Sequence, residues 1–319
     1  MHTSADKKID LFHLNDYTIP IGEFDHHLHG SIVTQFEEEF SAYVGAKYAC
    51  ALSSATNAIF LAASCKRSLF QIPTILPPVV ANAIFNAGSD FKFMDDFSWV
   101  GHSYTLQSYK DFKLIDSAQR VDKDQFKEAD DQDLMIFSFY PTKPVGGIDG
   151  GMIVSNDKEK IDYFRTIAMN GMSFSENNWE RKAKYVGWKM YMSSSQAWVA
   201  LQNLRRLDAK KARLAEVREQ YNKHFKLART SSHLYRINVD NREQVMKAAS
   251  HHGVVTGVHY APLHQMELYS LIVLERALAR TPNLTASEEE GRTTLSLPFH
   301  EGMTDTDVKK VISVIEDAR

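Results

Sequence analysis

The chain contains few cysteines, Cys50 and Cys65 being the two among its 319 residues. Two cysteines cannot build the disulfide framework of a small secreted protein, so we expect a reducing compartment, the cytoplasm. No uninterrupted apolar run reaches about 18 residues, the length that a membrane-spanning helix requires, so we expect no membrane association. The first residues lack a charged segment followed by an apolar one, which argues against a signal peptide.

An excess of charge of one sign is also absent. The net charge is −3, which gives no positive field for binding nucleic acid, and we expect no nucleic-acid partner. The basic residues between 205 and 213 are interpreted as the solvated face of a helix, because no helix-turn-helix or RNA-binding motif accompanies them. The sequence has no repeats or low-complexity segments, and its composition is typical of a globular protein. Its length allows one large domain or two modest ones.

Short β-rich segments alternate with helical patterns through the first half of the chain. A helix is predicted over 56–65. The predicted strands are 47–52, 91–94, 112–115, 134–139 and 152–155. This alternation predicts an α/β fold with a mostly parallel sheet flanked by helices.

The pattern changes near Met192. The stretch 193–225 predicts one long helix, because apolar residues recur there at helical spacing. A strand (234–239), a helix (242–252), a second strand (254–260) and a terminal helix (304–318) follow. We therefore expect a large domain over residues 1–195, and a connecting helix with a small C-terminal α+β domain over residues 196–319.

A turn of small residues, Ser53-Ser54-Ala55-Thr56-Asn57, lies where the first predicted strand meets the first helix. The N-terminus of a helix exposes unpaired N–H groups and a positive dipole end, which together favour binding of an anion such as phosphate. Ordinary capping of the helix by Ser54 or Thr56 is the alternative interpretation.

Asp116 and Lys143 each follow a predicted strand. Asp116 lies at the edge where open α/β folds bind ligands, so it could pair with a cationic ring nitrogen or merely begin a turn. Lys143 precedes the glycine-rich segment 146–151; a semi-buried lysine can form a Schiff base, whereas most loop lysines are simply exposed. A phosphate-binding turn, a strand-end aspartate and a lysine are together what pyridoxal phosphate requires.

The chain resembles the DegT/DnrJ/EryC1/StrS family of nucleotide-sugar aminotransferases, which use pyridoxal phosphate and have fold-type I. The motifs that carry the resemblance are 36–45, 53–56, 82–88, 116–119, 137–143, 150–154, 169–172, 192–193, 196–197, 207–208, 259–264 and 296–298. The resemblance implies transfer of an amino group from an amino acid, glutamate by analogy, to a keto group of a nucleotide-linked deoxysugar. It also implies a homodimer whose two active sites share residues.

The resemblance implies roles for individual residues. Lys143 falls on the Schiff-base lysine, which also moves the proton, and Asp116 falls on the carboxylate that keeps the pyridine nitrogen protonated. Gln119 falls beside the ring hydroxyl, and Lys189 falls near a position that reaches the phosphate of the neighbouring subunit. The expected phosphate-binding residues are Ser54, Ala55, Thr56 and Ser138. The expected substrate contacts are His29, Tyr260 and His264.

Among the departures of the sequence from the family pattern, two concern the cofactor ring and the substrate wall. The segment 76–80 lacks the aromatic residue that normally stacks on the cofactor ring, and only 20 residues separate Asp95 from Asp116, where the family has a much longer segment. We expect part of the sheet flank and of the substrate wall to be missing. These departures leave open a family member that binds pyridoxal phosphate without transamination, as a regulatory or partner protein.

Two other interpretations are weaker. The sugar dehydratase branch of the family carries histidine at the position of Lys143, so the lysine argues against it. In a strand, His27 and His29 would share a face and His26 would not, and no cysteine or other third ligand is near, so we expect no metal site there.

Overall fold

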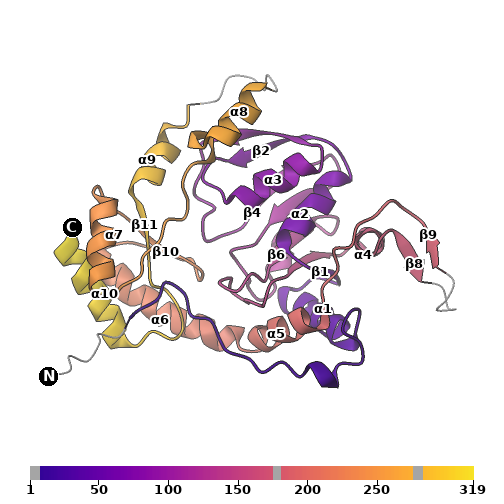
Figure 1. Ribbon diagram of the computed structural model, residues 1–319, viewed down its shortest axis with the longest axis horizontal. Coiled ribbons are helices and arrows are strands. Elements are labelled where there is room, and N and C mark those ends of the chain that lie inside the picture. The colour runs from indigo at the N-terminus through magenta and orange to yellow at the C-terminus, as the bar shows by residue number, and fades with distance from the viewer. Residues whose placement is uncertain (1–7, 175–180, 276–282) are drawn as a thin grey trace.

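The computed structural model describes residues 8–174, 181–275 and 283–319 (Figure 1). Residues 1–7, which open the segment that argues against a signal peptide, therefore lie outside the described part. No helix within the described residues is long and apolar enough to cross a membrane.

Helices and strands alternate through the first half of the chain. These elements are α1 (Ser31–Val44), β1 (Tyr48–Leu52), α2 (Ala55–Ser64), β2 (Leu69–Pro73), α3 (Pro78–Asn86), β3 (Asp90–Met94), β4 (Tyr104–Ser108), β5 (Lys113–Asp116), β6 (Leu134–Ser138), β7 (Gly151–Ser155) and α4 (Lys158–Ala168). The strands predicted from the sequence correspond to β1, β3, β5, β6 and β7, and the helix predicted over 56–65 is α2. The predicted α/β architecture is confirmed.

The central sheet has five strands in the order β1-β7-β6-β5-β4. Its β5–β6 pairing is parallel, whereas β1–β7, β7–β6 and β4–β5 are antiparallel. β2 and β3 form a separate parallel pair. The sheet is therefore mixed rather than mostly parallel, because β4 and β7 both run against their neighbours.

β4 explains how the chain spans the short segment between Asp95 and Asp116. A helical crossover between parallel strands needs a dozen or more residues, which the segment cannot supply in addition to a strand and its connections. The chain instead makes a hairpin, in which Tyr104 pairs with Asp116 and Ser108 pairs with Lys113. This strand was not predicted from the sequence.

Helices cover both faces of the sheet. On β6, Ile136 faces the apolar cluster that includes α2, α3 and α4, whereas Phe137 faces the cluster that includes α1 and α5. This alternation follows from the two-residue period of a strand. A third apolar cluster gathers Ile9 with residues between 214 and 315, at the end of the molecule that holds both α10 and the first described residues (Figure 1).

The second half is mainly helical. Its elements are β8 (Met172–Phe174), β9 (Arg181–Ala183), α5 (Ser194–Leu204), α6 (Leu207–Phe225), β10 (Tyr235–Asn238), α7 (Arg242–His251), α8 (Glu267–Glu275), α9 (Thr285–Thr293), β11 (Thr294–Leu297) and α10 (Asp305–Ala318). The β8–β9 hairpin projects from the body of the molecule (Figure 1).

Two predictions for this half are corrected. The single helix over 193–225 is two helices, α5 and α6, because the chain turns at Arg205 and Arg206. The strand predicted over 254–260 is wrong: the segment makes isolated bridges, Val254 to Ile9 and Gly257 to Ser296. Its two bridging partners come from different parts of the chain, so no continuous ladder forms along it.

Candidate active site

The turn at the start of α2 is built from small residues packed against β7. Ser54 Oγ accepts a hydrogen bond from the Asn57 N–H at 3.1 Å, so this serine is the N-cap of α2. Ala55 and Thr56 occupy the first turn, where N–H groups have no partner within the helix. A Cβ at Gly151 would lie 2.5 Å from Ala55 N, so a glycine is needed for this close packing.

Ser138 lies next to this turn, because it pairs with Gly151 across the β6–β7 ladder. Its side chain is buried, and its hydroxyl accepts a hydrogen bond from the Tyr140 N–H at 3.3 Å. The structure therefore brings together three elements that are far apart in the sequence: the start of α2, the end of β6 and the start of β7. The resulting turn has the free N–H groups and the hydroxyl that a phosphate requires.

Lys143 follows β6 in a tight turn closed by the hydrogen bond from its N–H to the Tyr140 carbonyl at 2.9 Å. Its side chain is largely buried. Burial lowers the pKa of Lys143 to about 8, and the negative charge of Asp116 acts in the opposite direction. An amine with such a pKa is partly neutral near pH 7 to 8 and can attack a carbonyl carbon.

Asp116 is buried at the end of β5. Burial raises the pKa of its carboxyl group, and three neighbours oppose the rise: the Ala118 N–H, the Tyr104 hydroxyl and Lys143. Ala118 N–H donates to Oδ1 at 2.9 Å and Tyr104 O–H donates to Oδ2 at 3.1 Å. Both carboxylate oxygens are thus held by neutral donors.

The charge of Lys143 acts on two histidines from the C-terminal half, His233 and His259. Burial, with the charge of Lys143 second, lowers the pKa of His259 to about 4 and the pKa of His233 well below its ordinary value. His259 Nδ1 lies 2.8 Å from Ser296 Oγ. The Phe12 ring lies 5.9 Å from each imidazole. Both imidazoles are therefore neutral at pH 7 and bring no positive charge toward the lysine.

Gln119 links Asp116's loop to the C-terminal half. Its side-chain amide donates to the Tyr260 hydroxyl at 2.7 Å, and its side-chain oxygen accepts from the Gly101 N–H at 2.6 Å. The Tyr260 ring is parallel to Trp99, with the ring centroids 6.2 Å apart. The structure thus places Gln119 and Tyr260, two residues that were predicted to be in the site, in direct contact.

His29 and Lys189 flank the same region. His29 adopts a left-handed backbone conformation, with φ 58°, and its ring centroid lies 4.1 Å from that of Tyr191. Lys189 is exposed and pairs through its backbone with Met169. The Ser53 N–H donates to the Met190 carbonyl at 2.8 Å, so the segment that carries Lys189 runs beside the turn at the start of α2.

His264 is held elsewhere. Its Nδ1 lies 2.7 Å from Thr74 Oγ1, and its Nε2 lies 3.0 Å from a carboxylate oxygen of Glu288. One ring nitrogen of His264 therefore contacts the residue after β2, and the other contacts α9. None of these partners belongs to the group around Lys143, so the expected role of His264 in substrate binding stays a prediction.

The sequence did not indicate that four further residues lie near the site: Trp99, Tyr104, His233 and Phe12. Trp99 and Tyr104 lie in the short segment before Asp116, and the aromatic residues of that segment were the available signal. His233 and Phe12 carry no local signal, since only tertiary contacts bring His233 within the influence of Lys143 and Phe12 against His233.

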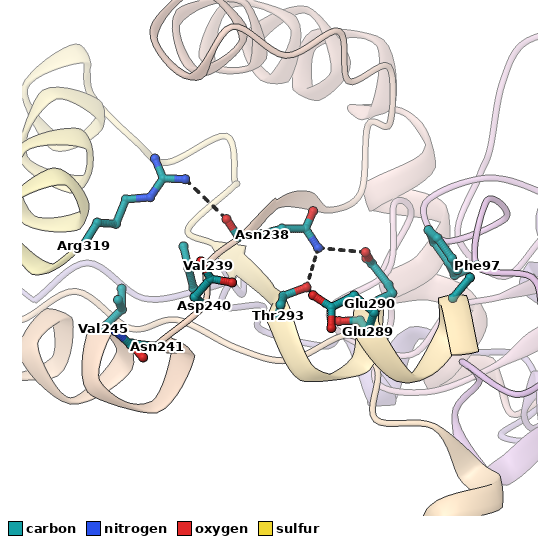
Figure 2. A pocket seen from close by; sticks show the side chains of 11 residues that line it. Phe97, Asn238, Val239, Asp240, Asn241, Val245, Glu289, Glu290, Thr293 and Arg319 are labelled. Carbon is teal, nitrogen blue, oxygen red and sulfur yellow. Dashed lines mark hydrogen bonds between the residues drawn. The ribbon is translucent and has the colours of Figure 1, made fainter. Parts of the chain in front are cut away.

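A separate cavity of about 660 Å³ lies in the C-terminal half (Figure 2). Its lining comes mainly from the ends of β10, α7, α9 and α10, together with Phe97. Asn238 donates to Glu290 Oε2 at 2.8 Å and to Thr293 Oγ1 at 2.9 Å. None of the sequence-predicted site residues lines this cavity, so its volume does not identify the reaction centre.

The chain is similar in sequence to known proteins. The model of the DegT/DnrJ/EryC1/StrS aminotransferase family matches residues 21–75 and 127–316. The chain is 28% identical to the spore coat polysaccharide biosynthesis protein SpsC of Bacillus subtilis, over 353 aligned positions that span 90% of each chain. It is 26% identical to UDP-4-amino-4,6-dideoxy-N-acetyl-beta-L-altrosamine transaminase of Campylobacter jejuni, over 88% of each.

Solved structures share the fold. PseC of Helicobacter pylori, an aminotransferase involved in the biosynthesis of pseudoaminic acid, superposes with a TM-score of 0.79 at 16% identity, covering 98% of this chain and 99% of that one. The protein Spr1654 of Streptococcus pneumoniae, solved in its PLP form, gives a TM-score of 0.77 at 17% identity, covering 98% of this chain and 100% of that one. The expected fold is therefore confirmed.

Proposed function

Because the chain belongs to the DegT/DnrJ/EryC1/StrS aminotransferase family, we propose that it uses pyridoxal phosphate to move an amino group from an amino acid, glutamate by analogy, to a keto group of a nucleotide-linked deoxysugar. The observation that carries the proposal is a largely buried lysine with a lowered pKa, Lys143, whose charge and that of the buried Asp116 influence each other's pKa. The relatives named above, one of them a UDP-sugar transaminase, support the substrate class.

The donor set fits the cofactor. The N–H groups of Ala55 and Thr56, with the hydroxyls of Ser54 and Ser138, would hold the phosphate. Asp116 would accept a hydrogen bond from the protonated ring nitrogen, and Gln119 would lie beside the ring hydroxyl. The close approach of Gly151 to the start of α2 supports this assignment, because it keeps the turn and Ser138 side by side.

Bound pyridoxal phosphate supplies an electron sink for the carbanion that forms at the amino donor. Lys143 Nζ would hold the cofactor covalently in the resting protein. Displaced by the donor, the same amine would take the proton from the donor α-carbon and later return one in the reverse direction. Asp116 would keep the ring nitrogen protonated, and the neutral His233 and His259 would cap the lysine without competing for its proton.

A second candidate is a family member that binds the cofactor but does not turn over. The family model leaves residues 76–126 unmatched, and this segment contains Asp116, Gln119 and the shortened stretch. Retention of Lys143, Asp116 and Ser138 supports turnover instead. The two candidates differ in one half-reaction, which is the transfer of the donor's amino group to the bound cofactor.

The test is the visible absorbance of the protein after incubation with pyridoxal phosphate, followed by addition of glutamate. We expect a yellow band that requires Lys143, that disappears in Lys143→Ala and that persists in Lys47→Ala, a matched exposed lysine. Glutamate should then convert the band to the spectrum of the pyridoxamine form. A stable band that no amino donor changes would favour the second candidate, and no band in the wild type would refute both.

We propose further that the protein is a homodimer and that Lys189 reaches the phosphate of the neighbouring active site. The exposed side chains of Leu28, Tyr140 and Ile148 support an interface on segments that adjoin His29 and Lys143. Lys189 is itself exposed, as a residue that contacts a second chain must be in the single subunit.

Light scattering should give twice the chain mass. Lys189→Ala should weaken pyridoxal phosphate binding by about tenfold or more, since a hydrogen bond to a charged group contributes ~1.5–3 kcal/mol. Lys184→Ala, a change at another exposed lysine of the same region, is the control. Equal cofactor affinity in both variants would place Lys189 away from the phosphate.

A further inference from the structure

The hairpin that replaces a crossover before β5 brings a tyrosine to the end of that strand. Tyr104 is the first residue of β4, and it pairs directly with Asp116, the last residue of β5. Residues directly opposite in an antiparallel pair have neighbouring side chains. The whole hairpin lies within residues 76–126, which the family model leaves unmatched, so the family match assigns no role to Tyr104.

We propose that Tyr104 is a positioning residue. Its hydroxyl orients the Asp116 carboxylate and keeps this carboxylate ionised, which is the form that holds the cofactor's ring nitrogen. The proposal rests on the proposed function, because it concerns the same site. Its geometric basis is that the Tyr104 hydroxyl donates to Oδ2 at 3.1 Å while the Ala118 N–H donates to Oδ1 at 2.9 Å. Two donors on different oxygens define the plane of the carboxylate.

The aromatic residues around Tyr104 hold its ring in place. Its centroid lies 4.8 Å from that of Trp99, and Trp99 Nε1–H donates to the Ile75 carbonyl at 3.0 Å. Trp99 is buried and lies parallel to Tyr260, which accepts the hydrogen bond from Gln119. The segment 99–104 therefore contacts both residues that are expected to face the cofactor ring, Asp116 and Gln119.

The physical effect has a definite sign. A hydroxyl that donates to a carboxylate stabilises its charged form and lowers its pKa. Tyr104 remains a donor throughout the working pH range, because burial, and after it the charge of Asp116, raises the pKa of its own hydroxyl well above the ordinary value. Without the Tyr104 hydroxyl, burial would raise the pKa of Asp116 further.

The other ionisable groups around Asp116 do not change this sign. Lys143, from the turn after β6, lowers the pKa of Asp116 and is present with or without the Tyr104 hydroxyl. Tyr260 faces Asp116 from the segment after Gly257, and its phenol is neutral because burial raises its pKa. Burial lowers the pKa of His259 to about 4 and the pKa of His233 well below its ordinary value, so both imidazoles are neutral at pH 7.

The experiment is the dissociation constant of pyridoxal phosphate as a function of pH, measured on wild type and Tyr104→Phe. Binding should weaken as the pH falls through the pKa of Asp116, because the protonated carboxyl no longer accepts a hydrogen bond from the ring N–H. In Tyr104→Phe, which keeps the ring packed on Trp99, this acid-side midpoint should move to higher pH by about one unit, the size expected for one lost hydrogen bond to a charged group.

Tyr109→Phe is the matched control. It removes a tyrosine hydroxyl from the same hairpin, where the ring stacks on Phe112 at 4.7 Å and away from Asp116, so the midpoint should stay unchanged. Asp116→Asn should remove the acid-side transition, which identifies the titrating group. If Tyr104→Phe does not fold, Tyr104→Met offers an apolar side chain that likewise lacks the hydroxyl.

The outcomes separate this proposal from the proposed function. Wild type that binds pyridoxal phosphate through Lys143, with the same midpoint in Tyr104→Phe, would overturn the role of Tyr104 and leave the function standing. A uniform loss of affinity at every pH without a shift would indicate a merely structural role and would also overturn it. Wild type that binds no cofactor would refute the proposed function first.

Discussion

At the scale of the single residue, Lys143 shows how burial prepares an amine for chemistry. The solvated value of its pKa is 10.5, and burial lowers it to about 8 although Asp116 acts in the opposite direction. The neutral amine, which is the nucleophile, is therefore a substantial fraction near pH 7.5, whereas a solvated lysine would be almost wholly protonated there.

The rate at which the cofactor-free protein reacts with pyridoxal phosphate should follow this pKa. Below about pH 8 the neutral fraction of Lys143 rises with pH, and above it the fraction levels off, so we expect a rate that rises and then reaches a plateau. Asp116→Asn removes the charge that raises the pKa, so its midpoint should lie at lower pH than in the wild type. Stopped-flow absorbance measures both profiles, and a wild-type midpoint near 10.5 would contradict the burial of Lys143.

At the scale of the element, the contact between α2 and β7 holds the phosphate-binding turn in place. Gly151, the first residue of β7, packs on the backbone of Ser54 and Ala55, and a Cβ there would come within 2.6 Å of the Ser54 carbonyl. Backbone atoms cannot move aside as the end of a flexible side chain can. α2 would have to shift away from β7 and from Ser138.

We expect Gly151→Ala to lower the free energy of unfolding by about 1–3 kcal/mol, the usual cost of overpacking, and to weaken pyridoxal phosphate binding as well. Gly22→Ala is the matched control, because nothing lies within 4 Å of a Cβ at Gly22. Urea unfolding of the cofactor-free proteins gives the first quantity, and absorbance titration with the cofactor gives the second. Equal stability of the two variants would show that α2 and β7 have room to move apart.

At the scale of the whole molecule, a buried ion pair within the C-terminal half holds the segment that carries His259 and Tyr260. Arg236 on β10 lies 2.8 Å from Glu290 on α9, and each side chain is 8% exposed. The same guanidinium donates to the His259 carbonyl at 3.2 Å, next to Tyr260. Glu290 also accepts the hydrogen bond from Asn238 at the cavity shown in Figure 2.

Glu290→Gln should destabilise the protein by about 3–5 kcal/mol, because it leaves the buried charge of Arg236 without its counter-ion. Glu289→Gln changes the neighbouring residue, whose exposed pairing with Arg292 is screened by water, and should leave the midpoint of thermal unfolding unchanged. Calorimetry at the same pH compares the two variants. Equal midpoints of thermal unfolding for Glu290→Gln and Glu289→Gln would contradict this prediction, because they would mean that solvent reaches Arg236 and screens its charge.

Short stretches of sequence carried much of the prediction for the site. Lys143, Asp116 and the Ser54–Thr56 turn were predicted as site residues because each combines a residue type with a local position after a strand or before a helix. The same local signals located β1, β3, β5, β6 and β7. The division into residues 1–195 and 196–319 stays a prediction.

By itself, then, the sequence determined the alternation of strands and helices, because periodicity and capping are properties of neighbouring residues. The order of its short motifs identified the family. The sequence also pointed to three local features that suit pyridoxal phosphate: the turn before α2, Asp116 and Lys143. Tertiary structure alone decided the rest. The direction of β4, the pairing of Tyr104 with Asp116 and the approach of His233 and His259 to Lys143 depend on contacts between distant segments. Such contacts are set by how the whole core packs, and no local pattern encodes them.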